Sequence, residues 1–269
     1  MTKHPEYRDG APCWIDLSTP DLAGAQRFYG GLFDWSFDAP NQQLGGYVNA
    51  RIGGQAIAGL MTKQPGDPTP SAWGVWLKSS NLEETARKVL AAGGQQLMPI
   101  HDVADIGRML LVTDPTGAFI GFWQFGTHRG SARKNVPGAM CWHELYTRDA
   151  AAADRFYEAL FDYTKSAPIG APEGGCANDS SMDYAVFNRD GEPVFGRMKM
   201  TSQHFPDTVP PHWLTHFTVA DHDATAEKIR KLGGKSLCDA MDTPYGRVSM
   251  ALDPYGAAFG ILEPPSQPA

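Results

Sequence analysis

The sequence predicts an α+β protein of two similar domains in tandem, each built from two strand–helix–strand–strand–strand units. Two repeats predict this architecture: a long one that relates the two halves of the chain, and a shorter one inside each half. The length of 269 residues is typical of two domains of ordinary size. With 42% hydrophobic residues the chain can form packed cores, which excludes an intrinsically disordered protein.

The long repeat opens with a seven-residue motif. CWIDLST at residues 13–19 returns as CWHELYT at residues 141–147, and each copy is followed by Arg-Phe-Tyr and then Leu-Phe-Asp. Two further segments repeat: residues 73–94 as 213–234, and DPTGA at 114–118 as DPYGA at 253–257. The chain is therefore a tandem duplication.

The duplication predicts the domain boundaries. We expect the first domain at residues 11–125 and the second at 139–264. Residues 126–138 (GTHRGSARKNVPG) are polar, basic and glycine-bearing, as is typical of a linker. Residues 1–10 and 265–269 remain as tails.

The first unit of the first half begins with the alternating residues 13–19, which predict a strand. Asp21 then caps a helix that runs to about Phe33. We expect Phe28 of this helix, like Phe156 of its repeat, to be buried beneath a sheet.

The second unit has the same order of signals. Residues 73–79 alternate as a strand, and Asn81 caps a helix that runs to about Ala92 and ends at a glycine pair. Segments punctuated by Gly and Pro follow each helix, at residues 45–61 and 108–124, and predict antiparallel strands.

The Phe-Tyr pair inside the first helix and the DPxG turn before the last strand resemble the vicinal oxygen chelate superfamily of glyoxalases, bleomycin-resistance proteins and extradiol dioxygenases. The resemblance covers residues 11–263. The paired Cys-Trp openings are more narrowly similar to a branch of hydroxylase-type or antigen-type glyoxalase-like proteins. The resemblance implies that two units curl their sheets into an incomplete barrel around a cup, which usually holds a divalent metal chelated by substrate oxygens.

The resemblance also implies where the metal ligands, usually two histidines and a carboxylate, would stand. The first lies seven residues before the cap of the first helix, the second correspondingly before the other helix, and the carboxylate seven residues after the Asp of DPxG. These positions hold Trp14, Gly74 and Gly121 in the first half, and Trp142, Leu214 and Gly260 in the second. None of these side chains binds a metal. We therefore predict no cofactor, and a divalent metal held elsewhere stays open.

Alternate residues of a strand share a face, so the strand phase predicts which side chains enter each cup. The first cup should combine aromatic rings for stacking with a buried ion pair between Asp16 and Lys78. The residues expected there are Trp14, Asp16, Ser18, Trp76, Lys78, Phe119 and Trp123. Those expected in the second cup are Trp142, Glu144, Tyr146, His216, Thr218 and Leu262.

Glu144 and His216 are the predicted catalytic residues, because a carboxylate and an imidazole facing one cavity form an acid–base pair. Two other roles stay open for them: a structural hydrogen bond between the two, and weak metal binding. His143 is expected to face the helices. A slip of one residue in the strand phase would instead send His143 into the cup.

The composition excludes several classes. Thirty acidic and 23 basic residues give a formal charge of −7, which argues against binding nucleic acid. No run of 18 apolar residues predicts a membrane span, and residues 1–10 lack the apolar stretch of a signal peptide. We expect a cytoplasmic protein, monomeric or homodimeric, with four reduced cysteines.

Two functions compete. The first is a glyoxalase-fold protein without the usual metal triad that binds a small aromatic or oxygenated metabolite in its cups. The alternative is an enzyme of the same superfamily, a hydroxylase, lyase or dioxygenase-like protein that uses Glu144 and His216, with or without a metal. The missing metal ligands favour the binding protein. The sequence does not identify the ligand.

Overall fold

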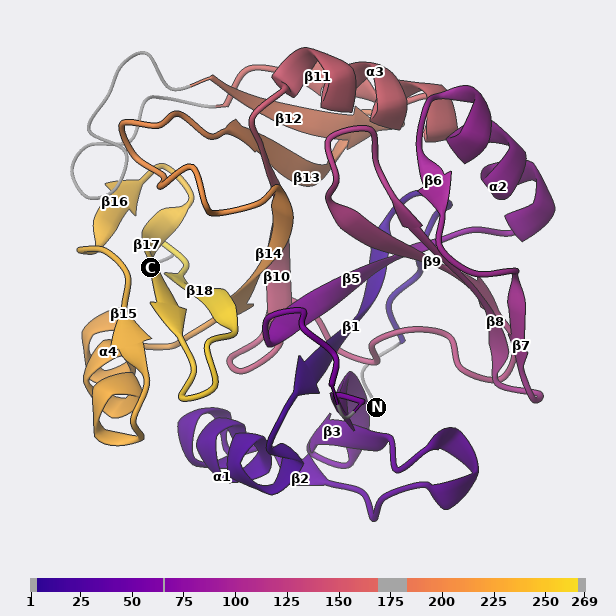
Figure 1. The fold of residues 1–269 in the computed structure, drawn as a ribbon. Helices are drawn as coiled ribbons and strands as arrows, with labels where there is room; N and C mark the ends of the chain where they lie inside the picture. The colour runs from indigo at the N-terminus through magenta and orange to yellow at the C-terminus, as the bar shows by residue number, and fades with distance from the viewer. Residues whose placement is uncertain (1–3, 65, 169–182, 266–269) are drawn as a thin grey trace.

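The structure is a computed structural model that describes residues 4–64, 66–168 and 183–265 (Figure 1). Each half of the chain forms one mixed sheet of nine strands within this described part. The first sheet contains β1 (Pro12–Thr19), β2 (Ser36–Phe37), β3 (Val48–Ile52), β4 (Gln55–Thr62), β5 (Ala72–Lys78), β6 (Gln95–Gln96), β7 (His101–Val103), β8 (Gly107–Thr113) and β9 (Phe119–Phe125). The second contains β10 (Met140–Thr147), β11 (Thr164–Ser166), β12 (Tyr184–Arg189), β13 (Glu192–Lys199), β14 (His212–Thr218), β15 (Lys235–Ser236), β16 (Met241–Thr243), β17 (Gly246–Leu252) and β18 (Ala258–Glu263).

The two sheets have the same topology. In the first, β1 and β5 pair antiparallel at the centre, β4 runs parallel to β1, and β9 runs parallel to β5. In the second, β10, β14, β13 and β18 take the same places. The predicted α+β fold of repeated βαβββ units is confirmed.

Four helices follow the opening strands of the four units: α1 (Leu22–Phe33), α2 (Leu82–Ala91), α3 (Ala150–Phe161) and α4 (His222–Lys231), and a short 3-10 helix, η1, spans Gln42–Leu44. Asp21 and Asn81 cap α1 and α2 as predicted, each accepting a hydrogen bond from a backbone amide of the first turn. The helices pack in pairs across the two halves, α1 beside α4 and α2 beside α3 (Figure 1).

The helix aromatics join the halves. Phe28 and Phe156 are buried, as predicted, but Phe28 packs edge-on against Phe259 of the second sheet, with ring centroids 6.2 Å apart. The neighbouring Tyr29 accepts a hydrogen bond from Trp73 Nε1 at 2.9 Å and donates one to Asp253 Oδ2 at 3.2 Å. The Phe-Tyr pair of one half therefore binds the DPxG turn of the other.

The same junction recurs by symmetry. Tyr157 donates to Asp114 Oδ2 at 3.1 Å and accepts from Trp213 Nε1 at 3.2 Å. One apolar cluster accordingly contains buried residues of both halves. The two sheets share a core and are not separate folding units joined only by a linker.

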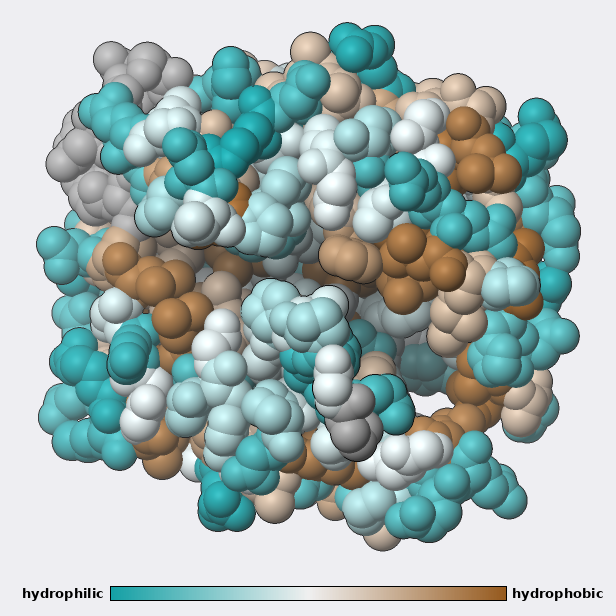
Figure 2. Space-filling view, in the orientation of Figure 1, coloured by the Kyte–Doolittle hydropathy of each residue, from teal (hydrophilic) through white to brown (hydrophobic). Residues whose placement is uncertain are grey.

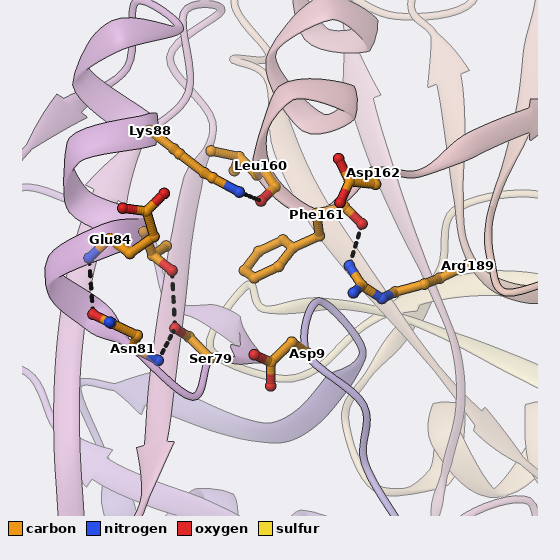
Figure 3. Close-up of a pocket in the computed structure, with 10 residues that line it drawn as sticks. Asp9, Ser79, Asn81, Glu84, Lys88, Leu160, Phe161, Asp162 and Arg189 are labelled. Atoms are coloured by element: carbon orange, nitrogen blue, oxygen red, sulfur yellow. Dashed lines mark hydrogen bonds between the residues drawn. The ribbon is translucent and has the colours of Figure 1, made fainter.

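Side chains hydrogen-bond to the carbonyl groups at the C-terminal end of the first helix of each half. A cavity of about 150 Å³ lies between α2 and α3. Figure 3 shows the residues that line it, among them Lys88, whose Nζ donates to the Leu160 carbonyl at 3.1 Å, and Arg189, which donates to the Phe161 carbonyl. Lys228 makes the equivalent bond to the Leu32 carbonyl at 3.2 Å. Lysines of one half thus satisfy the free carbonyls at the C-terminal ends of helices in the other.

The structure tests two further predictions, the absence of a membrane span and the reduced state of the cysteines. No helix in the described part of the chain is long and apolar enough to cross a membrane. Cys13 and Cys141 are free thiols, but Cys238 takes part in a disulfide bond, so the prediction of a reduced thiol is wrong there. The distance between two cysteines depends on the tertiary fold, which their spacing in the sequence did not give. Cys176 lies outside the described residues.

Candidate functional site

The second cup is the face of the second sheet that turns away from the helices. On β14, Trp213 packs against Tyr157 of α3, and Phe217 against Phe33 of α1. The alternate residues of β14 point to the opposite face, and His216 is among them. The predicted strand phase is confirmed, because His143 lies in the core and pairs with Thr215, with its Nδ1 3.2 Å from the hydroxyl.

Glu144 is the centre of a buried polar network in this cup. His216 Nε2 lies 2.9 Å from Glu144 Oε2, which also accepts from the Tyr146 hydroxyl at 2.9 Å. Tyr184 donates to Oε1 at 2.7 Å and accepts from Trp142 Nε1 at 3.0 Å. The predicted contact between Glu144 and His216 is confirmed, and their catalytic role remains a prediction.

The network keeps the carboxylate ionised. Burial raises the pKa of Glu144, but the adjacent imidazole of His216 and the two tyrosine hydroxyls outweigh it, so the pKa lies below its usual range. An ionised carboxylate only accepts hydrogen bonds, which assigns the proton of the imidazole to Nε2 of His216. Burial and the adjacent negative charge raise the pKa of Tyr146 and Tyr184, which remain donors.

His216 Nδ1 is a buried polar atom of the cup. The side chain is 4% exposed, and Nδ1 has no hydrogen-bond partner among the described residues. The ring lies over Gly260, where an added Cβ would stand 2.0 Å from Nδ1. Gly260 is one of the positions where the family usually has a metal ligand, and here the absence of a side chain makes room for the imidazole.

The rest of the cup is mainly apolar, apart from Thr218, whose buried hydroxyl has no hydrogen-bond partner among the described residues. Tyr146, Met200 and Leu214 form a buried cluster on which Met198, Phe205, Val209, Met250 and Ala258 pack. Apolar surface also gathers over β17 and β18 on the face shown in Figure 2.

A loop between β13 and β14 lies against this cluster. The ring of the loop residue Phe205 lies 5.6 Å from that of Tyr146, and His212, the first residue of β14, stacks on Tyr146 with centroids 5.2 Å apart and planes 6° from parallel. Arg148 donates to the carbonyls of Pro206 and Val209, at 2.7 and 3.1 Å. These contacts hold the loop beside the cup.

The first cup repeats this design with different chemistry. Asp16 stands at the place of Glu144, and Tyr47, which accepts from Trp14 Nε1 at 2.8 Å, stands at the place of Tyr184. The place of His216 is taken by Trp76. Burial raises the pKa of Asp16 to about 6, although the Trp76 and Tyr47 side chains oppose the shift. The first cup therefore has no imidazole to pair with its carboxyl group.

A linker residue closes the first cup. The His128 ring packs edge-on against Trp14 at 4.3 Å and lies 5.7 Å from Trp123, whose Nε1 donates to the His128 carbonyl at 3.1 Å. Burial lowers the pKa of His128 to about 4, which keeps it neutral. The sequence did not indicate His128, because it lies in a segment that reads as a polar linker.

Tyr47 and Tyr184 were not predicted as site residues, although the repeat places them at equivalent positions. Tyr47 lies twelve residues before Gly59, and Tyr184 lies twelve residues before Gly196. An added Cβ at Gly59 would stand 1.7 Å from the Tyr47 hydroxyl, and one at Gly196 would stand 1.9 Å from the Tyr184 hydroxyl. Each glycine leaves the space that its tyrosine fills.

The predicted ion pair between Lys78 and Asp16 is wrong. Lys78 Nζ binds Asp9 of the N-terminal segment, and Asp16 lies opposite Gly74, four residues further along β5. Four residues of strand span about 13 Å, so two residues on one face are out of reach of each other. Phe119, also expected in this cup, is 54% exposed at the start of β9 and does not fill it.

The residues at the metal positions of the family do not fit a metal. In the second half, Trp142 Nε1 donates a hydrogen bond to the Tyr184 hydroxyl. Leu214 is part of the apolar cluster of the cup, and the ring of His216 lies over Gly260. Across the described ranges, no three His, Cys, Asp or Glu side chains come together in a group that could hold a metal ion. Glu144, the carboxylate of the second cup, already accepts three hydrogen bonds.

Residues 140–261 match the family model described as the Glyoxalase/Bleomycin resistance protein/Dioxygenase superfamily. The whole chain is similar to "Putative glyoxylase CFP32" of Mycobacterium tuberculosis (strain CDC 1551 / Oshkosh), with 36% identity across 99% of this chain and 100% of the relative. The chain belongs to this superfamily. The chain is also similar to "Anthracycline biosynthesis protein DauV" of Streptomyces sp. (strain C5), with 32% identity across 96% of this chain and 94% of that relative.

Solved structures support the tandem fold of this superfamily protein. The 2,3-dioxygenase LapB from Pseudomonas sp. KL28 is similar with a TM-score of 0.65 and 14% identity, across 98% of this chain and 96% of LapB. The Mn(II)-bound glyoxalase from Novosphingobium aromaticivorans is similar with a TM-score of 0.62 and 12% identity, across 96% of this chain and 83% of that one. The predicted vicinal oxygen chelate membership and tandem glyoxalase-like architecture are confirmed.

Proposed function

We propose that this superfamily member binds small oxygenated aromatic metabolites in its cups, and does so without the metal triad that the fold usually carries. One observation carries the proposal: the side chains at the family's metal positions in the second cup are an indole, an isobutyl group and a hydrogen atom, each enclosed by its neighbours. The cup offers aromatic and methionine side chains instead, which suit a planar apolar body.

The relatives support the class of ligand. DauV is named for anthracycline biosynthesis, and anthracyclines are oxygenated aromatic polycycles. Tyr146, with His212 stacked on it, offers an aromatic surface of the same kind. Oxygen atoms of the ligand would then meet the Glu144–His216 network beside that surface.

Titration of purified protein with a panel of planar hydroxylated aromatics tests the proposal. We expect tryptophan fluorescence to change saturably for at least one compound, because Trp142 lies in the network, and to change equally after dialysis against EDTA. A stoichiometric Fe, Mn, Ni or Zn content that resists dialysis, together with binding lost on its removal, would contradict the proposal.

A second function, metal-independent acid–base catalysis, is favoured by the geometry of His216. An ionised carboxylate that orients an imidazole, with the other ring nitrogen unpaired, is the arrangement of a general base. If a ligand of the panel is turned over, Glu144→Gln and His216→Ala should each reduce kcat by at least about 100-fold while circular dichroism stays unchanged. Turnover that survives both substitutions would place the chemistry elsewhere.

A further inference from the structure

We propose that the second cup selects its ligand by hydrogen-bond polarity: it takes a planar, largely apolar molecule whose hydroxyl group, a phenol or an enol, donates to Nδ1 of His216. A ketone or an ether of the same shape would bind less well. The inference rests on the proposed function of the cup as a binding site, and it adds the chemical group that the site recognises.

The hydrogen-bond network decides which role Nδ1 has. Both oxygens of Glu144 are engaged, Oε1 by Tyr184 and Oε2 by Tyr146 and His216. Since a carboxylate has no proton to give, the nitrogen that faces it must be N–H, and the other nitrogen of a neutral imidazole must then be a lone-pair acceptor. A second proton on Nδ1 would instead bury a charged donor without a partner.

Within the described part of the chain, no donor is bonded to Nδ1. The atom faces Gly260 of β18, and the strand register places Met250 opposite Gly260 and Val248 opposite Leu262. These side chains belong to the apolar clusters of the cup and have no N–H or O–H group. A buried acceptor without a partner costs free energy, which a ligand hydroxyl would recover on binding.

The first cup differs at the equivalent position. Trp76 stands where His216 stands in the second cup, and an indole nitrogen only donates hydrogen bonds. The unpaired imidazole nitrogen of the first cup, Nε2 of His128, lies beside Trp14 and Trp123, so the proposal concerns the position of His216 alone.

Isothermal titration calorimetry with three probes tests the inference: 2-naphthol, 2-methoxynaphthalene, which keeps the oxygen without its proton, and naphthalene, which controls for the shared ring. We expect wild-type protein to bind 2-naphthol at least about tenfold more tightly than 2-methoxynaphthalene, a difference typical of one hydrogen bond to a buried group. In His216→Phe all three affinities should agree within about threefold, because the ring is kept and the acceptor is lost. His101→Phe, on the exposed strand β7, should keep the wild-type preference.

The outcomes separate the two proposals. Equal binding of 2-naphthol and 2-methoxynaphthalene to wild-type protein would overturn the polarity inference and leave the binding function standing. A preference that persists in His216→Phe would also overturn the inference. Binding of none of the three probes would count against the binding function itself.

A second variant keeps the test decisive if His216→Phe does not fold. Glu144→Gln offers an amide N–H to Nε2, which moves the imidazole proton to Nδ1 and turns the acceptor into a donor. We expect this variant to lose the preference for 2-naphthol. An unchanged preference in a folded Glu144→Gln protein would overturn the inference.

Discussion

At the scale of single residues, the pKa values of two carboxyl groups at equivalent positions, Asp16 and Glu144, are shifted in opposite directions. Asp16 has no imidazole beside it, so burial dominates and raises its pKa to about 6. Glu144 has His216 and two tyrosine hydroxyls, and its pKa is lowered in spite of burial. Two differences between the halves, His216 in place of Trp76 and Tyr146 in place of Ser18, separate the chemistry of the two cups.

This contrast predicts opposite effects of pH on stability. A raised pKa in the folded state means that Asp16 stabilises the fold most below pH 4, and that this contribution is lost as the pH rises through about 6. Relative to Asp16→Asn, the free energy of unfolding of the wild-type protein should fall by up to about 3 kcal/mol between pH 4 and pH 8. Urea unfolding at the two pH values measures the difference.

Glu144→Gln is the matched control. The lowered pKa of Glu144 means that its contribution is present above its unfolded pKa and lost as the pH falls. Relative to this variant, wild-type stability should therefore rise between pH 4 and pH 8. If wild-type stability changed with pH in the same direction relative to both variants, the surroundings of Asp16 and Glu144 would not shift their pKa values in opposite directions.

At the scale of elements, the tyrosine of the first helix joins three segments. Tyr29 of α1 links Trp73 of β5 to Asp253 in the turn before β18. The hydroxyl is buried and has a raised pKa, first because of burial and then because of the nearby Asp253 charge. Tyr157 makes the equivalent links in the other direction.

Removing this hydroxyl should destabilise the protein without emptying the core. Tyr29→Phe keeps the ring but leaves the Trp73 Nε1 proton unpaired, which costs about 1–3 kcal/mol for a buried polar group. Tyr157→Phe should cost a similar amount because its partners are equivalent. Thermal unfolding followed by circular dichroism checks both, and a loss below about 0.5 kcal/mol in each would show that the links add little.

At the scale of the whole molecule, the shared core predicts that the two halves unfold together. Phe28 of the first half packs on Phe259 of the second, and its ring lies 3.1 Å from the position of a Cβ added at Gly234. A cluster that contains both sheets cannot lose one half without exposing the apolar face of the other.

Phe28→Ala tests this cooperativity. Truncation of a large buried ring should cost about 3–5 kcal/mol. Hydrogen exchange measured by mass spectrometry should then show weaker protection in β18 as well as in α1, because the same cluster supports both. Protection lost only in the first half would mean that the halves unfold independently.

The site residues that the sequence predicted correctly were those that follow from the alternation of strand faces. Alternation between faces is a local property of a strand, so the sequence placed Glu144 and His216 in the cup and His143 in the core, and the structure confirms both. The repeat supplied the equivalences between the halves, and the helix caps at Asp21 and Asn81 followed from neighbouring residues alone.

The sequence by itself therefore determined the repeated units, the helix boundaries and the faces of the strands. Only the tertiary structure decided which distant groups meet: Lys78 with Asp9, His128 with Trp14, and Phe28 with Phe259. The reason is physical. Periodicity and capping arise between residues within a few positions of each other, whereas strand register, the path of the linker and packing across the halves depend on contacts between segments that the sequence keeps far apart.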